Sequence, residues 1–145
     1  MKNPKFFTVE EADQMIGLLE TTLERIKRNK QEFLWLQREL AILELIVECG
    51  ADGNNPDAVE LAQKTKRLKR IAKYIEKDVA TLEATGCVLR DLDSGIVDFF
   101  SIQDGTVVFL CWKKGEDSIR HWHSIRDGFA GRQPLSPAPG SRIQE

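Results

Sequence analysis

The fold is decided where the chain reads DVATLEATGCVLRDLDSGIVDFF, residues 78–100. Before Gly86, apolar residues recur at steps of three and four, the spacing of one helix face. From Cys87 onward they alternate with polar residues, as in a strand. Gly86 lies at the change, in the position where a glycine commonly ends a helix. The sequence therefore predicts an α+β fold, in which a long antiparallel helical hairpin precedes a small antiparallel sheet of three or four strands.

Two helices are predicted before this point, over about residues 8–48 and 56–85. Thr8 and Glu11 have the spacing of a capping box at the start of the first helix. The stripe of apolar residues is thin around Asn29, so the continuity of this helix there stays open. The second helix carries a heptad-like seam, which favours coiled-coil packing on the first. The seam consists of Leu61, Thr65, Leu68, Ala72, Ile75, Val79 and Leu82.

The sheet is predicted over about residues 87–125, divided by turns at 93–95, 103–105 and 113–117. Residues 118–125 fit either a fourth strand or a short helix. Residues 126–135 read as an ordered loop. Residues 136–145 are rich in proline and polar residues, and we expect a disordered tail. We therefore expect one α+β domain over residues 1–135.

Charge and hydropathy indicate an ordinary cytoplasmic protein. The net charge is −2, which gives no overall attraction to nucleic acid or to an anionic membrane. No apolar run approaches the roughly 20 residues of a membrane helix, and no signal-peptide pattern follows Met1. Six basic residues lie within 64–73, but glutamates of the first helix can pair with them, so nucleic-acid binding is not expected. The cysteines lack CxxC spacing and are expected to be reduced.

The first helix is unusually apolar over residues 33–47. A helix that is apolar on most sides must be covered on most sides, and a single partner helix cannot do this. The sheet or a second subunit is expected to cover the remainder. The sequence therefore predicts a homodimer formed through the long helices.

The C-terminal half resembles the bacterial domain of unknown function 2203 family. The resemblance rests on the runs GIVDF at 95–99, LCWK at 110–113, WH at 122–123 and GFAGRQPL at 128–135, with FTVEEA at 7–12 near the start. The chain departs from it at Phe100, where a proline is expected, and at His121, where an aromatic residue is expected. The resemblance supports the fold but implies no mechanism.

His121 and His123 are the two histidines of the chain. On a strand, residues two apart face the same side, and His-x-His is a spacing that metal ligands use. Asp98 or Asp127 would add an oxygen ligand. The alternative is that both histidines are ordinary strand residues beside Trp122. No cofactor is predicted on this basis, although a divalent metal stays an alternative.

Asp98 is the most suggestive single residue, because its strand face is otherwise apolar. A carboxylate there needs a partner, which Arg132 or Arg126 would provide in a structural ion pair. Alternatively, Asp98 is a base or a ligand with a perturbed pKa. Gly131 and Arg132 offer backbone N–H groups and a guanidinium to an anion.

Two classes of function follow from these residues. The first is a non-enzymatic interaction or scaffold protein that acts as a homodimer through its helices. The second is a protein that binds a small anion or a metal, conceivably an enzyme. Its candidate site residues are Asp98, Trp112, Trp122, His123, Gly131 and Arg132, with His121 and His123 as candidate metal ligands.

Overall fold

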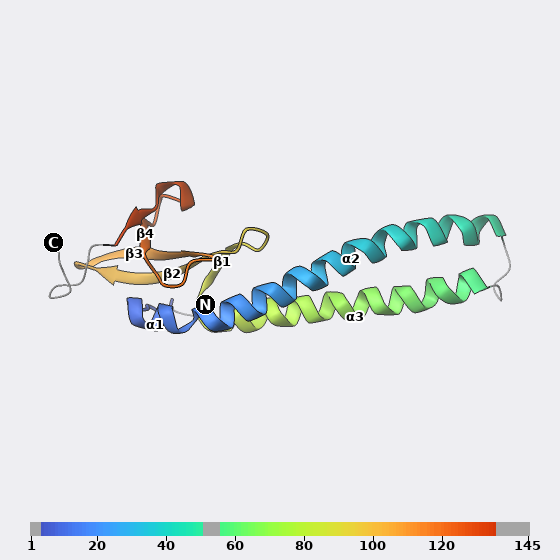
Figure 1. Ribbon diagram of the computed structural model, residues 1–145, viewed down its shortest axis with the longest axis horizontal. Coiled ribbons are helices and arrows are strands. Elements are labelled where there is room, and N and C mark those ends of the chain that lie inside the picture. Colours follow the sequence, from blue (N-terminus) through green and yellow to red (C-terminus); the bar gives the residue numbers. More distant parts are fainter. Residues whose placement is uncertain (1–3, 51–55, 136–145) are drawn as a thin grey trace. The chain divides into compact units, whose positions relative to one another are not determined.

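The computed structural model describes residues 4–50 and 56–135 (Figure 1). The expected disordered tail, residues 136–145, lies outside the described residues. The described chain falls into two compact units. The first unit combines the residues up to Leu23 with those from Leu82 onward, and the second spans Glu24–Thr81. The predicted α+β architecture of a helical hairpin followed by an antiparallel sheet is confirmed.

The predicted first helix is two helices, α1 (Val9–Gln14) and α2 (Ile16–Gly50), with a one-residue interruption at Met15. Helix α1 begins with the predicted capping box: the Glu11 amide donates to the Thr8 hydroxyl, and the Thr8 amide donates to the Glu11 carboxylate. Helix α2 runs through Asn29 without a break. Helix α3 (Pro56–Ala84) follows, and Gly86, with a positive φ of 100°, lies just beyond its end.

The second unit, Glu24–Thr81, contains most of α2 and of α3, which lie side by side as a hairpin (Figure 1). Ion pairs join them, among them Arg25–Asp78, Glu32–Arg67 and Glu39–Lys64. In these pairs the residue number rises along α2 from 25 to 39 while it falls along α3 from 78 to 64, so the helices are antiparallel. Leu36, Leu40 and Leu43 of α2 are buried in this arrangement.

The sheet of the first unit has five antiparallel strands in the sequential order β1–β2–β3–β4–β5. The first three are β1 (Val88–Asp91), β2 (Ile96–Gln103) and β3 (Thr106–Lys113). Of the two structures predicted for residues 118–125, the strand is the one that forms, as β4 (His121–Ser124). The predicted loop holds a short 3₁₀ helix, η1 (Phe129–Gly131), and a two-residue fifth strand, β5 (Gln133–Pro134).

The two faces of the sheet differ in character. One face carries Val97 and Phe99 of β2 with Leu110 and Trp112 of β3, all buried. The N-terminal segment lies along this face, and the Phe7 ring meets the Phe99 ring edge-on at 5.0 Å. Alternation places Asp98, Cys111 and the two histidines on the opposite face. The face toward the N-terminal segment is therefore apolar, and the candidate site lies on the other face, which also carries the buried Phe109.

Candidate metal centre

A row of potential ligands crosses three neighbouring strands. Asp98 of β2 pairs in register with Cys111 of β3, and Cys111 pairs with His121 of β4. Side chains directly opposite each other on adjacent strands share one face and lie within contact distance. His123 lies two residues beyond His121, so it shares that face as well. The topology therefore places both predicted histidines on the same sheet face as Asp98, together with a thiol.

Three of these residues converge closely. One ligand atom each from Asp98, Cys111 and His123 lies within 4.8 Å of the other two. Within this cluster, His123 Nε2 lies 2.9 Å from Asp98 Oδ2. All three residues are buried. Carboxylate, thiolate and imidazole are the donor types that zinc accepts.

The ring of His123 is oriented by the backbone. Its Nδ1 lies 2.8 Å from the carbonyl oxygen of Ser124, and a carbonyl can only accept, so Nδ1 carries the proton. Nε2 then either carries a second proton toward Asp98 or presents its lone pair to a cation. Metal-bound histidines typically donate their other N–H to a carbonyl or carboxylate in this way.

Asp98 has two partners on one oxygen and none on the other. Its Oδ2 accepts from Arg90 Nε at 2.8 Å and faces His123 Nε2. Its Oδ1 is buried without a hydrogen-bond partner. A buried polar atom left unpaired is costly, so Oδ1 is the atom in the cluster that most needs a ligand. The sequence analysis named Arg132 or Arg126 as the partner of Asp98, but the structure pairs it with Arg90.

Burial raises the pKa of the Cys111 thiol to about 12, and the nearby Asp98 carboxylate adds to this effect. The thiol therefore keeps its proton at neutral pH in the absence of a cation. A bound metal reverses this preference, since metals bind the thiolate. Cys87 is also buried, but its Sγ lies 3.2 Å from the Leu82 carbonyl oxygen, and it is not one of the clustered ligands.

His121 lies at the margin of the cluster. Its Nδ1 is buried without a hydrogen-bond partner and lies 3.6 Å from Glu116 Oε2. A second unpaired donor or acceptor therefore accompanies the unpaired Asp98 oxygen on the same sheet face. His121 pairs with Cys111 across the two strands, but it is not one of the residues whose ligand atoms lie within 4.8 Å of one another.

Arg132 is held by protein groups. Its Nη2 donates to both carboxylate oxygens of Glu116, at 2.8 and 2.9 Å, and to the Cys111 carbonyl at 3.2 Å. Its guanidinium also stacks on Phe129, 4.6 Å from the ring centroid. Burial alone would raise the pKa of Glu116, but the hydrogen bonds from Arg132 and from the Lys113 amide lower it below its usual range. Arg132 thus fastens the C-terminal loop to the sheet.

Gly131 and the tryptophans lie apart from the ligand cluster. A Cβ at Gly131 would come within 2.7 Å of Asp127 Cβ, so the glycine permits close packing inside the loop. Trp112 pairs with Val97, and Trp122 pairs with Leu110. Alternation therefore directs both indoles to the face opposite Asp98. The Trp112 ring donates from Nε1 to the Glu116 carbonyl oxygen at 2.8 Å.

Sequence reasoning missed Cys111, Arg90 and Glu116. A signal for Cys111 was present, because Asp104–Gly105 is a two-residue turn with positive φ at both positions. Such turns fix the register of a hairpin, and counting back from this one places Cys111 opposite Asp98. Arg90 had no comparable signal, since the β1–β2 register shifts between Leu89 and Asp91.

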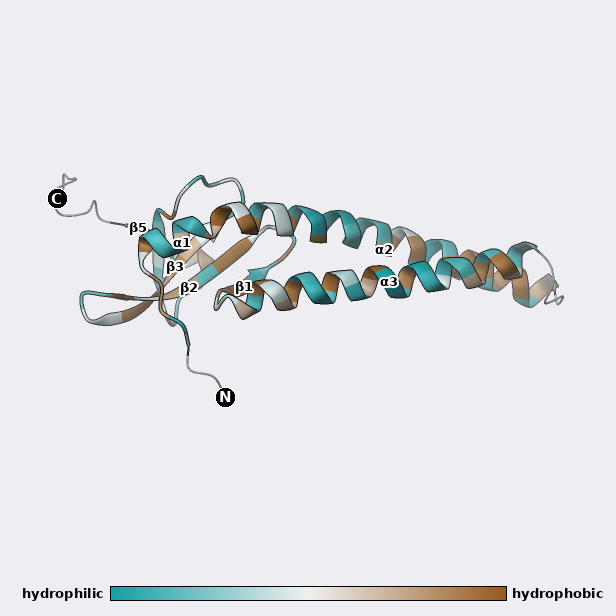
Figure 2. Cartoon of the chain, turned by 90° about the horizontal axis from the view of Figure 1, so that it is seen from below, coloured by the Kyte–Doolittle hydropathy of each residue, from teal (hydrophilic) through white to brown (hydrophobic). Residues whose placement is uncertain are grey.

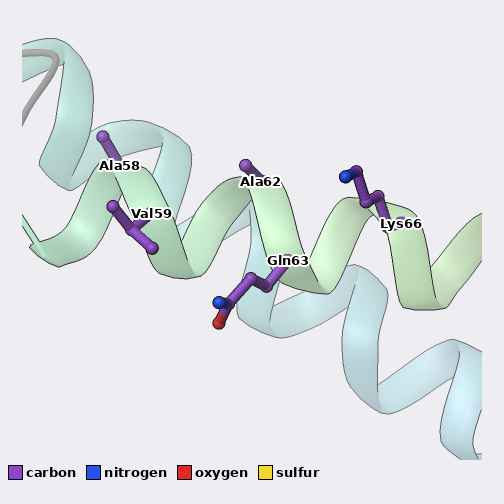
Figure 3. A pocket seen from close by; sticks show the side chains of 5 residues that line it. All are labelled: Ala58, Val59, Ala62, Gln63 and Lys66. Carbon is purple, nitrogen blue, oxygen red and sulfur yellow. The ribbon is translucent and has the colours of Figure 1, made fainter.

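The basic stretch of α3 pairs with α2, as expected. Lys64 binds Glu39, and Arg67 binds Glu32. A hollow of about 270 Å³ lies on the same helix near its start, lined by one helix alone (Figure 3). It contains one ionisable side chain, Lys66, and therefore offers no cluster of catalytic or ligand groups. Its lining consists of Ala58, Val59, Ala62, Gln63 and Lys66.

The fold and this residue cluster define an α+β protein that joins a helical hairpin to a five-stranded meander. Residues 5–135 match the model of the family described as an uncharacterized conserved protein, DUF2203. The chain belongs to this family, as the sequence resemblance indicated. No curated protein and no solved structure matches it. Within the described residues, no helix has both the length and the apolar character to cross a membrane.

Proposed function

We propose that this protein binds a divalent transition-metal ion of the zinc class on the sheet face that carries Asp98, Cys111 and His123. The observation that carries the proposal is the convergence of Asp98, Cys111 and His123 within 4.8 Å. Their chemistry suits zinc better than magnesium or calcium, which prefer oxygen ligands alone.

The unpaired atoms support the same conclusion. Asp98 Oδ1 and His121 Nδ1 are buried without hydrogen-bond partners. Asp98 would bind the ion through Oδ1 while Oδ2 keeps Arg90 and His123 as neighbours. His121 would complete a set of four ligands, which is the coordination number of structural zinc sites. Arg90 would then orient the Asp98 carboxylate, as outer partners of metal ligands commonly do.

The burial of the site favours a metal that is held rather than one that reacts with a substrate. Asp98 and His123 are 2% and 1% exposed, and Cys111 is fully buried. A catalytic zinc needs an open position for water or substrate. We therefore propose a non-enzymatic metal-binding role, in which the ion fastens β2, β3 and β4 together.

The competing explanation is that Arg90, Asp98 and His123 form an ion-pair network that needs no metal. The two explanations differ in what happens when Zn²⁺ or Co²⁺ is added to chelated protein. Under the metal proposal, Co²⁺ produces the intense near-ultraviolet absorption of a thiolate–cobalt bond, and Zn²⁺ at about 100 times its Kd adds about 2.7 kcal/mol of stability. Under the network explanation, neither change occurs.

The matched variants are Cys111→Ser and Cys87→Ser. Both remove a buried thiol, but only Cys111 lies in the ligand cluster. The cobalt band should vanish in Cys111→Ser and persist in Cys87→Ser. His121→Ala should weaken zinc binding while keeping the thiolate band. Retention of the band in Cys111→Ser, or an affinity weaker than millimolar for the unmodified protein, would refute the metal site.

A further inference from the structure

The second unit carries an apolar surface that its own partner helix does not cover. Two sets of apolar residues lie on α2. Leu36, Leu40 and Leu43 are buried, whereas a second set, here called the outer stripe, is 43–64% exposed. The outer stripe consists of Leu34, Trp35, Ile42, Leu45 and Ile46. Hydrophobic residues (brown) recur along α2 in Figure 2.

The outer stripe lies on the side of α2 opposite Leu40, and Trp35 forms its edge toward α3, where the Lys64 ammonium lies 5.0 Å from the centre of the Trp35 ring. At 3.6 residues per turn, its members cluster around the direction opposite to Leu40. Leu40 itself is buried, on the side where Glu39 and Glu32 reach α3. Helix α2 therefore has two apolar seams: α3 covers the first, and its Lys64 also contacts the second at Trp35, which is still 46% exposed. A contiguous exposed stripe of this kind is typical of an interaction surface.

We infer that the outer stripe pairs with the outer stripe of a second copy of this chain, with the two α2 helices antiparallel. The sequence of α2 is partly symmetric about Leu40. Trp35 and Leu45 lie five residues to either side of it, and Leu34 and Ile46 lie six. A two-fold interface requires that residue i meets j while j meets i. An antiparallel pair centred at Leu40 satisfies this requirement with apolar residues on both sides for these two pairs, whereas Ile42 lies opposite Arg38.

The same symmetry places two polar positions opposite each other. Gln31 and Cys49 each lie nine residues from Leu40, in the middle of the outer face. Both are exposed. Arg38 lies nearer the centre, where its alkyl stem can cover apolar surface while the guanidinium reaches the edge. In a parallel pair, Cys49 of one chain would instead lie opposite Cys49 of the other, and Gln31 opposite Gln31.

This geometry provides a direct test by cross-linking. In Gln31→Cys, the new thiol of one copy would lie beside the natural Cys49 of the other, and mild oxidation should join them into a covalent dimer. Within one copy the two positions are 18 residues apart on one helix, or roughly 27 Å at about 1.5 Å per residue. They cannot form an intramolecular disulfide, which requires Cα atoms about 4.4–6.8 Å apart.

The matched control is Gln37→Cys, an equally exposed glutamine on the same helix that lies at no symmetric position relative to Cys49. It should not form the dimer, and Cys49→Ser should abolish the cross-link in Gln31→Cys. Peptide mapping that finds a Cys49–Cys49 bond, or equal cross-linking of both variants, would overturn the antiparallel arrangement. The other two thiols are buried and do not compete.

Sedimentation of the uncross-linked protein supplies the second measurement. The 16.5 kDa chain should sediment as a dimer at micromolar concentration. Trp35→Glu should raise the dimer dissociation constant at least 100-fold, whereas Tyr74→Glu should leave it within threefold. Trp35 and Tyr74 are 46% and 52% exposed, so both substitutions charge an equally accessible aromatic of the second unit. An unmodified chain that stays monomeric at 100-fold higher concentration would overturn the inference and point to a different protein as the occupant.

Discussion

The sheet face and the helical hairpin break the usual distribution of polar and apolar residues in opposite ways. In the first unit, Asp98 and His123 are ionisable residues with almost no exposure. In the second unit, Leu45 and Ile42 are large apolar residues with more than half their surface exposed. Buried polar groups and exposed apolar patches are the informative exceptions in a protein. Under the two proposals made above, binding would resolve both exceptions: a cation would pair the buried polar groups, and another helix would cover the exposed apolar patch.

The largest effect is expected from breaking the polar cluster. Asp98→Ala removes the partner of Arg90 and leaves His123 buried beside an empty space. Removal of one member of a buried ionic group typically costs about 3–5 kcal/mol, and we expect a loss of this size in urea denaturation of chelated protein. Asp117→Ala is the control, because Asp117 pairs with Arg120 on the surface and such pairs contribute at most about 1 kcal/mol. If Asp98→Ala and Asp117→Ala lowered the free energy of unfolding equally, the buried pair would contribute no more than the surface pair, contrary to this prediction.

A smaller effect is expected from the two leucine seams of α2. Leu36 is fully buried and Leu45 is 64% exposed. Leu36→Ala should destabilise the protein by about 3 kcal/mol, as buried leucines do. Leu45→Ala should change stability by less than about 0.5 kcal/mol when measured at a concentration where the chain is monomeric. If the protein dimerises through the outer stripe, the cost of Leu45→Ala should grow with protein concentration.

The smallest effect is expected at the edge of the polar cluster, where Glu116 binds Arg132. Glu116→Gln replaces charge-assisted hydrogen bonds, and we expect a loss of about 2 kcal/mol at pH 7. Because the folded-state pKa of Glu116 is lowered, its contribution is fully present above the unfolded pKa of about 4.5 and is lost as the pH falls through the folded value. The stability difference between the two proteins should therefore shrink below pH 4.5. A constant difference down to pH 3 would show that the pair contributes through packing alone.

The extent to which the sequence predicts this structure differs between the units. The period of the apolar residues was enough to identify both helices and the sheet, because each element buries one face. Once residues 121–124 are taken as a strand, the period of two also places His121 and His123 on the same face of the sheet. Met15, where the first helix is interrupted, had no such signal, since nothing in the local composition marks it as a helix breaker.

The candidate site was less predictable because it depends on strand register. Cys111 was accessible by counting from the Asp104–Gly105 turn. The connection from Lys113 to His121 begins with a turn closed by the Glu116 amide and the Lys113 carbonyl, but it is too long to fix the register, so the pairing of Phe109 with His123 had to come from the structure. Arg90 reaches Asp98 across an irregular pairing of β1 and β2. From charge alone, Arg132 and Arg126 were equally good candidates for the ion-pair partner of Asp98. The three-dimensional structure shows that the partner is Arg90 instead.

The sequential strand order has a consequence for the speed of folding. Each strand pairs with the one before it, and chains rich in such local contacts fold faster than chains that must close long loops. The N-terminal segment is the exception, because the Phe7 amide reaches the Phe100 carbonyl and Asp13 accepts from the Ile119 amide across 106 residues. All the proposed ligands lie within residues 98–123, so the ligand cluster can assemble from neighbouring hairpins before the N-terminal segment docks. The slow step of folding should therefore be the return of the N-terminus to a sheet that is already formed.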